Sequence, residues 1–203
     1  LRNSSAASDV YKRQVSNRGM RIFLTLFVAI SLWLVSNAEK PNIVIIFTDD
    51  QGYADLGCYG SKTNKTPRLD QLAKEGTMFT SFYTQAVCGP SRSALLTGRY
   101  PCRSKGWGMP AGEITFAELV KGAGYQTACI GKWDVSNRKP IIDRMPNAQG
   151  FDYFFGALGA NDPGTIKFHL NNEAAGTSKD MGGLTTLYTD KSIDFLKNKR
   201  DPK

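Results

Sequence analysis

The stretch Cys88-Gly89-Pro90-Ser91-Arg92, continued by Ser93-Ala94-Leu95-Leu96-Thr97-Gly98-Arg99, is the most informative part of the chain. Pro90 suits the first turn of a helix, because the first helical N–H groups have no partner within the helix. Gly98 is a residue type that commonly ends a helix. The pattern therefore predicts a loop that becomes a helix at Cys88, with Arg92 one turn along the same face. The positive end of a helix favours an anion and a nucleophile at this place.

Strand-like apolar runs alternate with helical patterns along the chain, as an α/β sheet requires. We expect strands at residues 42–47, 77–83 and 125–130. Helices are expected from Thr66-Pro67 to Gly76 and from the capping box Thr115–Glu118 to Gly122 or Gly124. Residues 139–172 predict long surface loops, and a last helix is expected with Thr189 as its cap or just inside it.

The beginning of the chain predicts export. Residues 1–19 are polar and aperiodic and are interpreted as a non-native leader before Met20. Residues 20–38 have a short basic start, an apolar run at 22–35 and a small-residue cleavage pattern at Ser36-Asn37-Ala38. The run is shorter than the about 20 apolar residues of a membrane span. We expect a cleaved signal peptide, a secreted or periplasmic protein and no stable membrane span; an uncleaved anchor is the alternative.

The net charge of the chain says little about its function and gives no support to a nucleic-acid partner. The 203 residues carry 26 Lys and Arg against 18 Asp and Glu, a formal charge of +8. Residues 1–38 hold five of these basic and one of these acidic side chains, which leaves +4 for residues 39–203. No basic run is interleaved with aromatic residues, so the sequence gives no case for a nucleic-acid partner. A mild positive excess can steer anionic substrates.

Polar side chains follow the predicted strands. Asp49 and Asp50 come after the first strand, the Cys88 turn after the second and Lys132 after the third. Ligands gather at the carboxyl ends of strands in open α/β sheets, so we expect these groups on one rim. Carboxylate oxygens suit calcium or magnesium. A zinc site is hard to build from one histidine, His169, which we interpret as a loop residue, and from cysteines without ligand spacing.

In its motifs the chain resembles the type I sulfatases of the alkaline phosphatase superfamily. The resemblance is carried by the Cys-x-Pro-Ser-Arg and Leu-Thr-Gly-Arg motifs and by three further blocks, Pro41–Gly52, Thr66–Asp70 and Gly131-Lys132-Trp133. It implies an α/β fold with a mixed, mainly parallel sheet flanked by helices. Residues 39–203 would be the N-terminal part of the catalytic domain. We therefore expect the chain to be truncated and inactive alone.

The resemblance also implies a mechanism. Cys88 would be oxidised to formylglycine by a formylglycine-generating enzyme or a radical maturase. One hydroxyl of the hydrated aldehyde would attack the sulfur of a sulfate ester (an aryl sulfate or a sulfated glycan), and the second would expel sulfate afterwards. Arg92 would hold the position-88 side chain, and Lys132 would contact the sulfate oxygens. Calcium, or else magnesium, would be held by Asp49, Asp50 and position 88.

One position departs from the family, which usually has Gly-Lys-Trp-His where this chain has Gly131-Lys132-Trp133-Asp134. A carboxylate does not supply the donor or positive character of an imidazole unless it is protonated. A remodelled pocket, a weakened enzyme and a noncatalytic relative are the open accounts, and Asp134 could bind a substrate hydroxyl or amine. The rival functions are a phosphate or phosphonate monoester hydrolase of the same superfamily and a noncatalytic sulfated-glycan binder.

Overall fold

The computed structural model describes residue 25 and residues 40–160 and 164–200. It divides into two units, Leu1–Phe47 and Thr48–Lys203. The predicted leader and signal peptide lie outside the described residues, apart from Thr25. No helix in the described part of the chain is long and apolar enough to cross a membrane.

The predicted strand at 42–47 in the first unit is wrong for this structure. No strand is assigned there, and Ile43, Val44, Ile45 and Ile46 are between 48% and 75% exposed. A β-strand needs the hydrogen bonds of a neighbouring strand, and apolar character alone does not supply them. The same reason applies to the predicted strand at 77–83, which is irregular and exposed.

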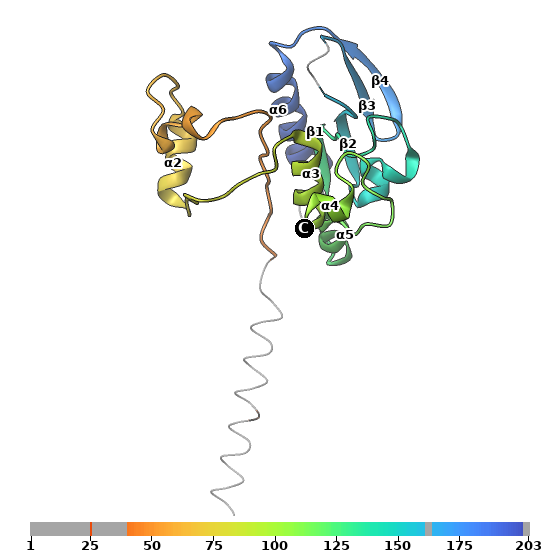
Figure 1. Ribbon diagram of the computed structural model, residues 1–203. Coiled ribbons are helices and arrows are strands. Elements are labelled where there is room, and N and C mark those ends of the chain that lie inside the picture. The colour runs from red at the N-terminus through yellow and green to blue at the C-terminus, as the bar shows by residue number, and fades with distance from the viewer. Residues whose placement is uncertain (1–24, 26–39, 161–163, 201–203) are drawn as a thin grey trace, which may run out of the picture. The chain divides into compact units, whose positions relative to one another are not determined.

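The second unit contains a four-stranded mixed sheet in the order β1-β2-β3-β4 (Figure 1). Its strands are β1 Ala128–Lys132, β2 Tyr153–Ala157, β3 Ile166–Leu170 and β4 Glu173–Ser178. β1 and β2 pair in parallel, from Ala128 with Tyr153 to Lys132 with Ala157. β2 with β3, and β3 with β4, pair antiparallel. The mixed sheet is as expected, and among the described strands its parallel pairing is confined to β1 and β2.

The described part of the chain contains five α-helices and four short 3-10 turns. The α-helices are α2 Pro67–Glu75, α3 Cys88–Thr97, α4 Pro101–Ser104, α5 Phe116–Gly122 and α6 Leu184–Asp194, which continues into a π-helical turn, Phe195–Lys199. Short 3-10 turns lie at Tyr53–Asp55, Gly57–Tyr59, Ile142–Arg144 and Pro146–Gln149. The capping box is confirmed: Thr115 Oγ1 accepts from Glu118 N, and Glu118 accepts from Thr115 N.

Two predictions for the C-terminal half are wrong. The expected long loops at 139–172 contain all of β2 and β3, and His169 lies in β3 opposite Gly156. Aromatic and apolar side chains there are buried in the sheet, which outweighs the Gly, Pro and Asn residues around them. The last helix begins at Leu184 rather than near Thr189, with Gly183 as its N-cap.

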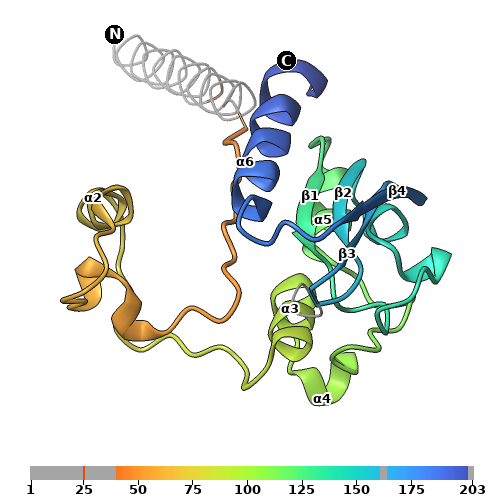
Figure 2. The ribbon, with the colours of Figure 1, turned by 90° about the horizontal axis from the view of Figure 1, so that it is seen from above.

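Helices cover both faces of the sheet (Figure 2). One buried cluster joins Leu96 of α3 and Ala117 of α5 to Phe154, with Cys129 packed against it. The other joins Leu184 and Tyr188 of α6 to Phe155 and its neighbours. Adjacent residues of β2 therefore point to opposite faces, as the pleat requires. Burial against the first cluster raises the pKa of the Cys129 thiol to about 12.

Candidate active site

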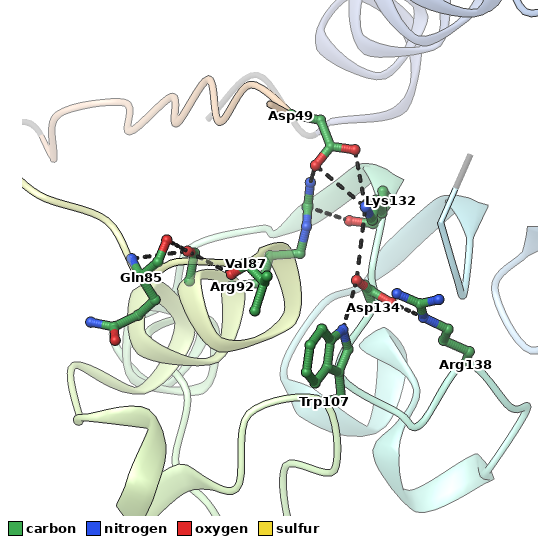
Figure 3. Close-up of polar contacts among 9 residues, drawn as sticks. Asp49, Gln85, Val87, Arg92, Trp107, Lys132, Asp134 and Arg138 are labelled. Carbon is green, nitrogen blue, oxygen red and sulfur yellow. Dashed lines mark hydrogen bonds and ion pairs between the residues drawn. The ribbon is translucent and has the colours of Figure 1, made fainter. Parts of the chain in front are cut away.

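Cys88 is the first residue of α3, preceded by the extended N-cap Val87. Pro90 lies in the first turn, and Gly98 ends the helix in the left-handed region at φ 63°, both as predicted. Ser91 Oγ donates to Val87 O at 2.9 Å and accepts from Gln85 N at 3.1 Å. These bonds fix the loop that enters the helix and so hold the backbone on the N-terminal side of Cys88 (Figure 3).

The residue after Cys88 must be glycine for a steric reason. A Cβ atom on Gly89 would overlap the indole ring of Trp107. The helix therefore begins directly against this ring, which is a closer approach than any side chain would allow. Trp107 was not selected from the sequence, because its contact with Gly89 of α3 joins residues 18 positions apart through tertiary packing.

Asp49, Arg92 and Lys132 meet, although they come from three distant segments of the chain (Figure 3). Lys132 Nζ lies 3.0 Å from Asp49 Oδ2 and 3.3 Å from Oδ1. Arg92 Nη2 lies 3.5 Å from Asp49 Oδ1, and Arg92 Nη1 donates to Lys132 O at 2.6 Å. The structure thus brings together Asp49 and Lys132, which the sequence placed on one rim, and Arg92, which it placed one turn into the helix after Cys88.

Lys132 stays charged although its side chain is only 5% exposed. Burial alone would lower its pKa. The hydrogen bond with Asp49 and the negative charges of Asp49 and Asp134 outweigh burial, and Cys88 acts in the same direction, so the pKa is raised above its ordinary value. The site therefore contains a fixed, desolvated ammonium group whose electrostatic neighbours include position 88.

Asp134 is fully buried and accepts hydrogen bonds at both carboxylate oxygens. Arg138 Nε donates to Oδ1 at 2.8 Å, and Trp107 Nε1 donates to Oδ2 at 3.2 Å. Lys132 Nζ lies 3.8 Å from Oδ2. Protein donors thus surround the carboxylate that the sequence suggested for a substrate hydroxyl or amine. Arg138 was not selected from the sequence, because the sequence does not show that Asp134 is buried.

Cys88 and Asp50 are more exposed to solvent than Lys132. Cys88 is half-buried, and all four cysteines, at 58, 88, 102 and 129, are thiols. Asp50 is exposed and has a left-handed backbone at φ 53°. No group of three or more His, Cys, Asp or Glu side chains in the described ranges is close enough to hold a metal ion. His169 lies in β3, where burial lowers its pKa.

Comparison with known proteins identifies the group to which this arrangement belongs. The sulfatase family profile matches residues 41–203. Human steryl-sulfatase is 42% identical over 161 residues, which are 68% of this chain and 27% of that protein. Human arylsulfatase A is 46% identical over 138 residues, 63% of this chain and 27% of that protein.

More distant relatives extend the match. Rat N-acetylgalactosamine-6-sulfatase is 37% identical over 214 residues, covering 89% of this chain and 40% of that protein. A solved structure of BT4656 in complex with its substrate D-glucosamine-2-N,6-O-disulfate aligns with a TM-score of 0.67 and 32% identity, over 80% of this chain and 32% of that one. The chain thus spans well under half of the relatives it matches, and it belongs to the sulfatase family.

Proposed function

We propose that this protein is an exported sulfatase that hydrolyses sulfate esters, with residue 88 as its nucleophile in the formylglycine form. The observation that carries the proposal is the meeting of Asp49, Arg92 and Lys132 beside the helix that begins at Cys88. A sulfate ester is an anion, and negative charge develops on its leaving oxygen as the S–O bond breaks. Buried cations of fixed position stabilise such charge more strongly than water does.

Each residue has a role that follows from its contacts. Lys132, held by Asp49 on one side, would donate to the sulfuryl oxygens. Arg92 bonds to Lys132 O and Asp49 at once, so it would fix both relative to position 88. Ser91 and Trp107 would hold the start of α3 and so aim the residue-88 side chain. Formylglycine at position 88 would supply, as its hydrate, one hydroxyl for attack and a second for release of sulfate.

The donor chemistry at Asp49 and Asp50 fits a hard divalent cation, for which we propose calcium. Carboxylate oxygens are its preferred ligands, and each carboxylate has more lone-pair sites than Asp49 uses for Lys132 and Arg92. The cation would add Lewis-acid stabilisation of the ester oxygens. Asp49, Asp50 and residue 88 make up only part of such a ligand set, so oxygen ligands beyond the described residues would complete it.

The substrate class and location rest on similarity and on sequence. Relatives named for aryl, steryl and amino-sugar sulfates support a sulfate ester of an aromatic compound or a glycan as substrate. The pattern at residues 20–38 supports export to the periplasm or outside the cell. A formylglycine-generating enzyme or a radical maturase would be the partner that converts Cys88.

The direct test compares hydrolysis of p-nitrophenyl sulfate and p-nitrophenyl phosphate by the protein expressed at the length of its relatives, together with a converting enzyme. We expect the sulfate ester to be the better substrate and Cys88→Ala to abolish its turnover. Faster hydrolysis of the phosphate ester would support a phosphate monoester hydrolase instead. Binding of sulfated glycans without any turnover would support a noncatalytic binder.

A further inference from the structure

The buried charge of Asp134 poses a problem for a site that binds anions. Asp134 is inaccessible to solvent and lies 3.8 Å from Lys132, which also serves Asp49. Asp49 and Asp134 together carry as much negative charge as Arg92 and Lys132 carry positive charge. Because Asp134 is buried and Lys132 is shared with Asp49, the Asp134 carboxylate needs a further cation as its partner.

Arg138 supplies that cation. Its Nε donates to Asp134 Oδ1 at 2.8 Å, and its side chain is 48% exposed although Asp134 is 0% exposed. Its aliphatic stem lies near Gly159, where an added Cβ would be 3.4 Å from it. The pair thus places the negative charge inside and the positive charge at the surface. A guanidinium suits carboxylate and sulfate groups because its planar N–H donors match their oxygens.

The backbone around the pair is specialised. Asp134, Asn137 and Arg138 all have left-handed backbones, with φ of 61°, 54° and 58°. Residues other than glycine adopt this region at a cost, and they keep it where their surroundings enforce it. Asn137 N donates to Trp107 O at 2.8 Å, and Ser136 forms a bridge with Gly108. These contacts hold the segment in the shape in which Asp134 and Arg138 meet.

Arg138 also lies close to the residue-88 turn. Its Cζ atom is 5.9 Å from the centre of the Trp107 ring, the same ring against which Gly89 packs. In Figure 3 Asp134 lies between Lys132 and Arg138. The Asp134 carboxylate thus separates Arg138 from Lys132. This position of Arg138 suits an anionic group beside the reacting ester rather than the ester itself.

The geometry points to Arg138 as a substrate-binding residue for a second anionic group, a carboxylate or another sulfate next to the reacting ester, with Asp134 as its positioning residue. This inference rests on the proposed sulfatase function. It names the preferred substrates as sulfate esters that carry two anionic groups. It also gives Asp134 a defined role: the carboxylate holds an exposed arginine in place instead of contacting substrate.

The test compares p-nitrophenyl sulfate with its ortho-carboxy derivative in the full-length, converted protein. The wild type should prefer the carboxylated ester about 10-fold in kcat/KM, mainly through KM, as expected for one charge-assisted hydrogen bond. Arg138→Met should remove this preference, so that kcat/KM falls about 10-fold more for the carboxylated ester than for the simple ester. Arg138→Lys should restore part of it. Lys139→Met removes the same charge from the next, exposed residue and should keep the preference.

A double-mutant cycle tests the role of Asp134. Asp134→Asn should lose the same preference, and Asp134→Asn/Arg138→Met should lose no more than either single variant, because the two residues act as a unit. Additive losses would overturn the positioning role. A wild type without the preference, or an Arg138→Met variant that keeps it, would overturn the inference. If the wild type hydrolyses neither ester, the sulfatase proposal fails, and calorimetric binding of the carboxylated ester to wild type and Arg138→Met decides the inference separately.

Discussion

Lys132 Nζ lies 3.0 Å from Asp49 Oδ2, across 83 positions of sequence. Both ends of this contact are fixed by further bonds, since Arg92 contacts the Asp49 carboxylate and the Lys132 carbonyl. The contact keeps the ammonium group charged in a place where burial alone would disfavour its charge. This contact joins Asp49 to the last residue of β1, and the proposed chemistry depends on it.

Replacing Lys132 should therefore affect catalysis more than folding. Lys132→Met is expected to lower kcat about 100-fold, the usual effect of removing one charged stabiliser of a transition state. Steady-state kinetics on p-nitrophenyl sulfate measure this, with Lys62→Met, which removes an exposed lysine, as the control. A Lys132→Met variant with wild-type kcat would show that the ammonium group does not act on the reacting sulfate.

Removal of divalent metal should abolish turnover. Treatment with a chelator is expected to inactivate the protein, and added calcium should restore it, because Asp49 and Asp50 present oxygen ligands. Asp50→Asn should raise the calcium concentration needed for half-maximal activity. Asp143→Asn, a carboxylate in a 3-10 turn away from these residues in sequence, is the matched control. Full activity after exhaustive chelation would contradict a metal at this place.

Gly89 should tolerate no side chain. Gly89→Ala is expected to destabilise the protein by about 1–3 kcal/mol and to reduce activity, because the added methyl group overlaps Trp107 at the start of α3. Gly112→Ala is the control, since nothing lies within 4 Å of the added Cβ there. Denaturant unfolding of both variants gives the comparison. Equal stability of the two would mean that the helix start has room to move.

The local signals of the sequence predicted helix boundaries better than strands. Pro90, Gly98 and the Thr115–Glu118 box act through neighbours in the chain, and the structure confirms all of them. The strand predicted at 125–130 exists as β1, shifted to Ala128–Lys132. Strands need partners distant in sequence, so apolar runs alone gave false strands at 42–47 and 77–83 and missed β2 to β4.

The site residues also separate into those that local patterns in the sequence predicted and those that depend on tertiary packing. The strand-end rule and the family motifs selected Asp49, Arg92 and Lys132, and the structure brings them together. Trp107 and Arg138 were missed because their roles depend on tertiary packing around Asp134. The departure at position 134 was visible in the sequence, but the arginine that balances its charge became evident only through the left-handed turns between them.

The capping box should contribute measurably to stability. Thr115→Ala is expected to cost about 1 kcal/mol, because it removes the acceptor for Glu118 N. The same hydroxyl also donates to Gln149 O at 2.8 Å inside the protein, so Thr115→Ser should retain most of the stability. Thr185→Ala on the exposed side of α6 serves as the control. An unchanged unfolding midpoint for Thr115→Ala would contradict the role of the cap.

Acid stability should depend on Asp152. Burial alone would raise the pKa of Asp152, but hydrogen bonds from Lys121 and Thr127 and the charge of Lys121 lower it below the ordinary value. A carboxyl with a lowered folded-state pKa stabilises the fold above its ordinary pKa of about 4, and this contribution disappears as the pH falls through the folded-state pKa.

Asp152→Asn should therefore reduce stability near neutral pH and flatten its loss on acidification below about pH 5. Unfolding midpoints measured from neutral to acidic pH test this, with Asp190→Asn, an exposed carboxylate of α6, as the charge-matched control. Parallel pH profiles for wild type and Asp152→Asn would show that the contact with Lys121 has no energetic effect.

The central claim is that residue 88 becomes a formylglycine nucleophile. Peptide mass analysis of the full-length protein, expressed with a converting enzyme, tests it most directly, because conversion of the Cys88 thiol to an aldehyde removes about 18 Da. We predict this loss together with reactivity of the same peptide toward a hydrazide probe. An unmodified Cys88 in the presence of a converting enzyme that modifies a known substrate would contradict the account.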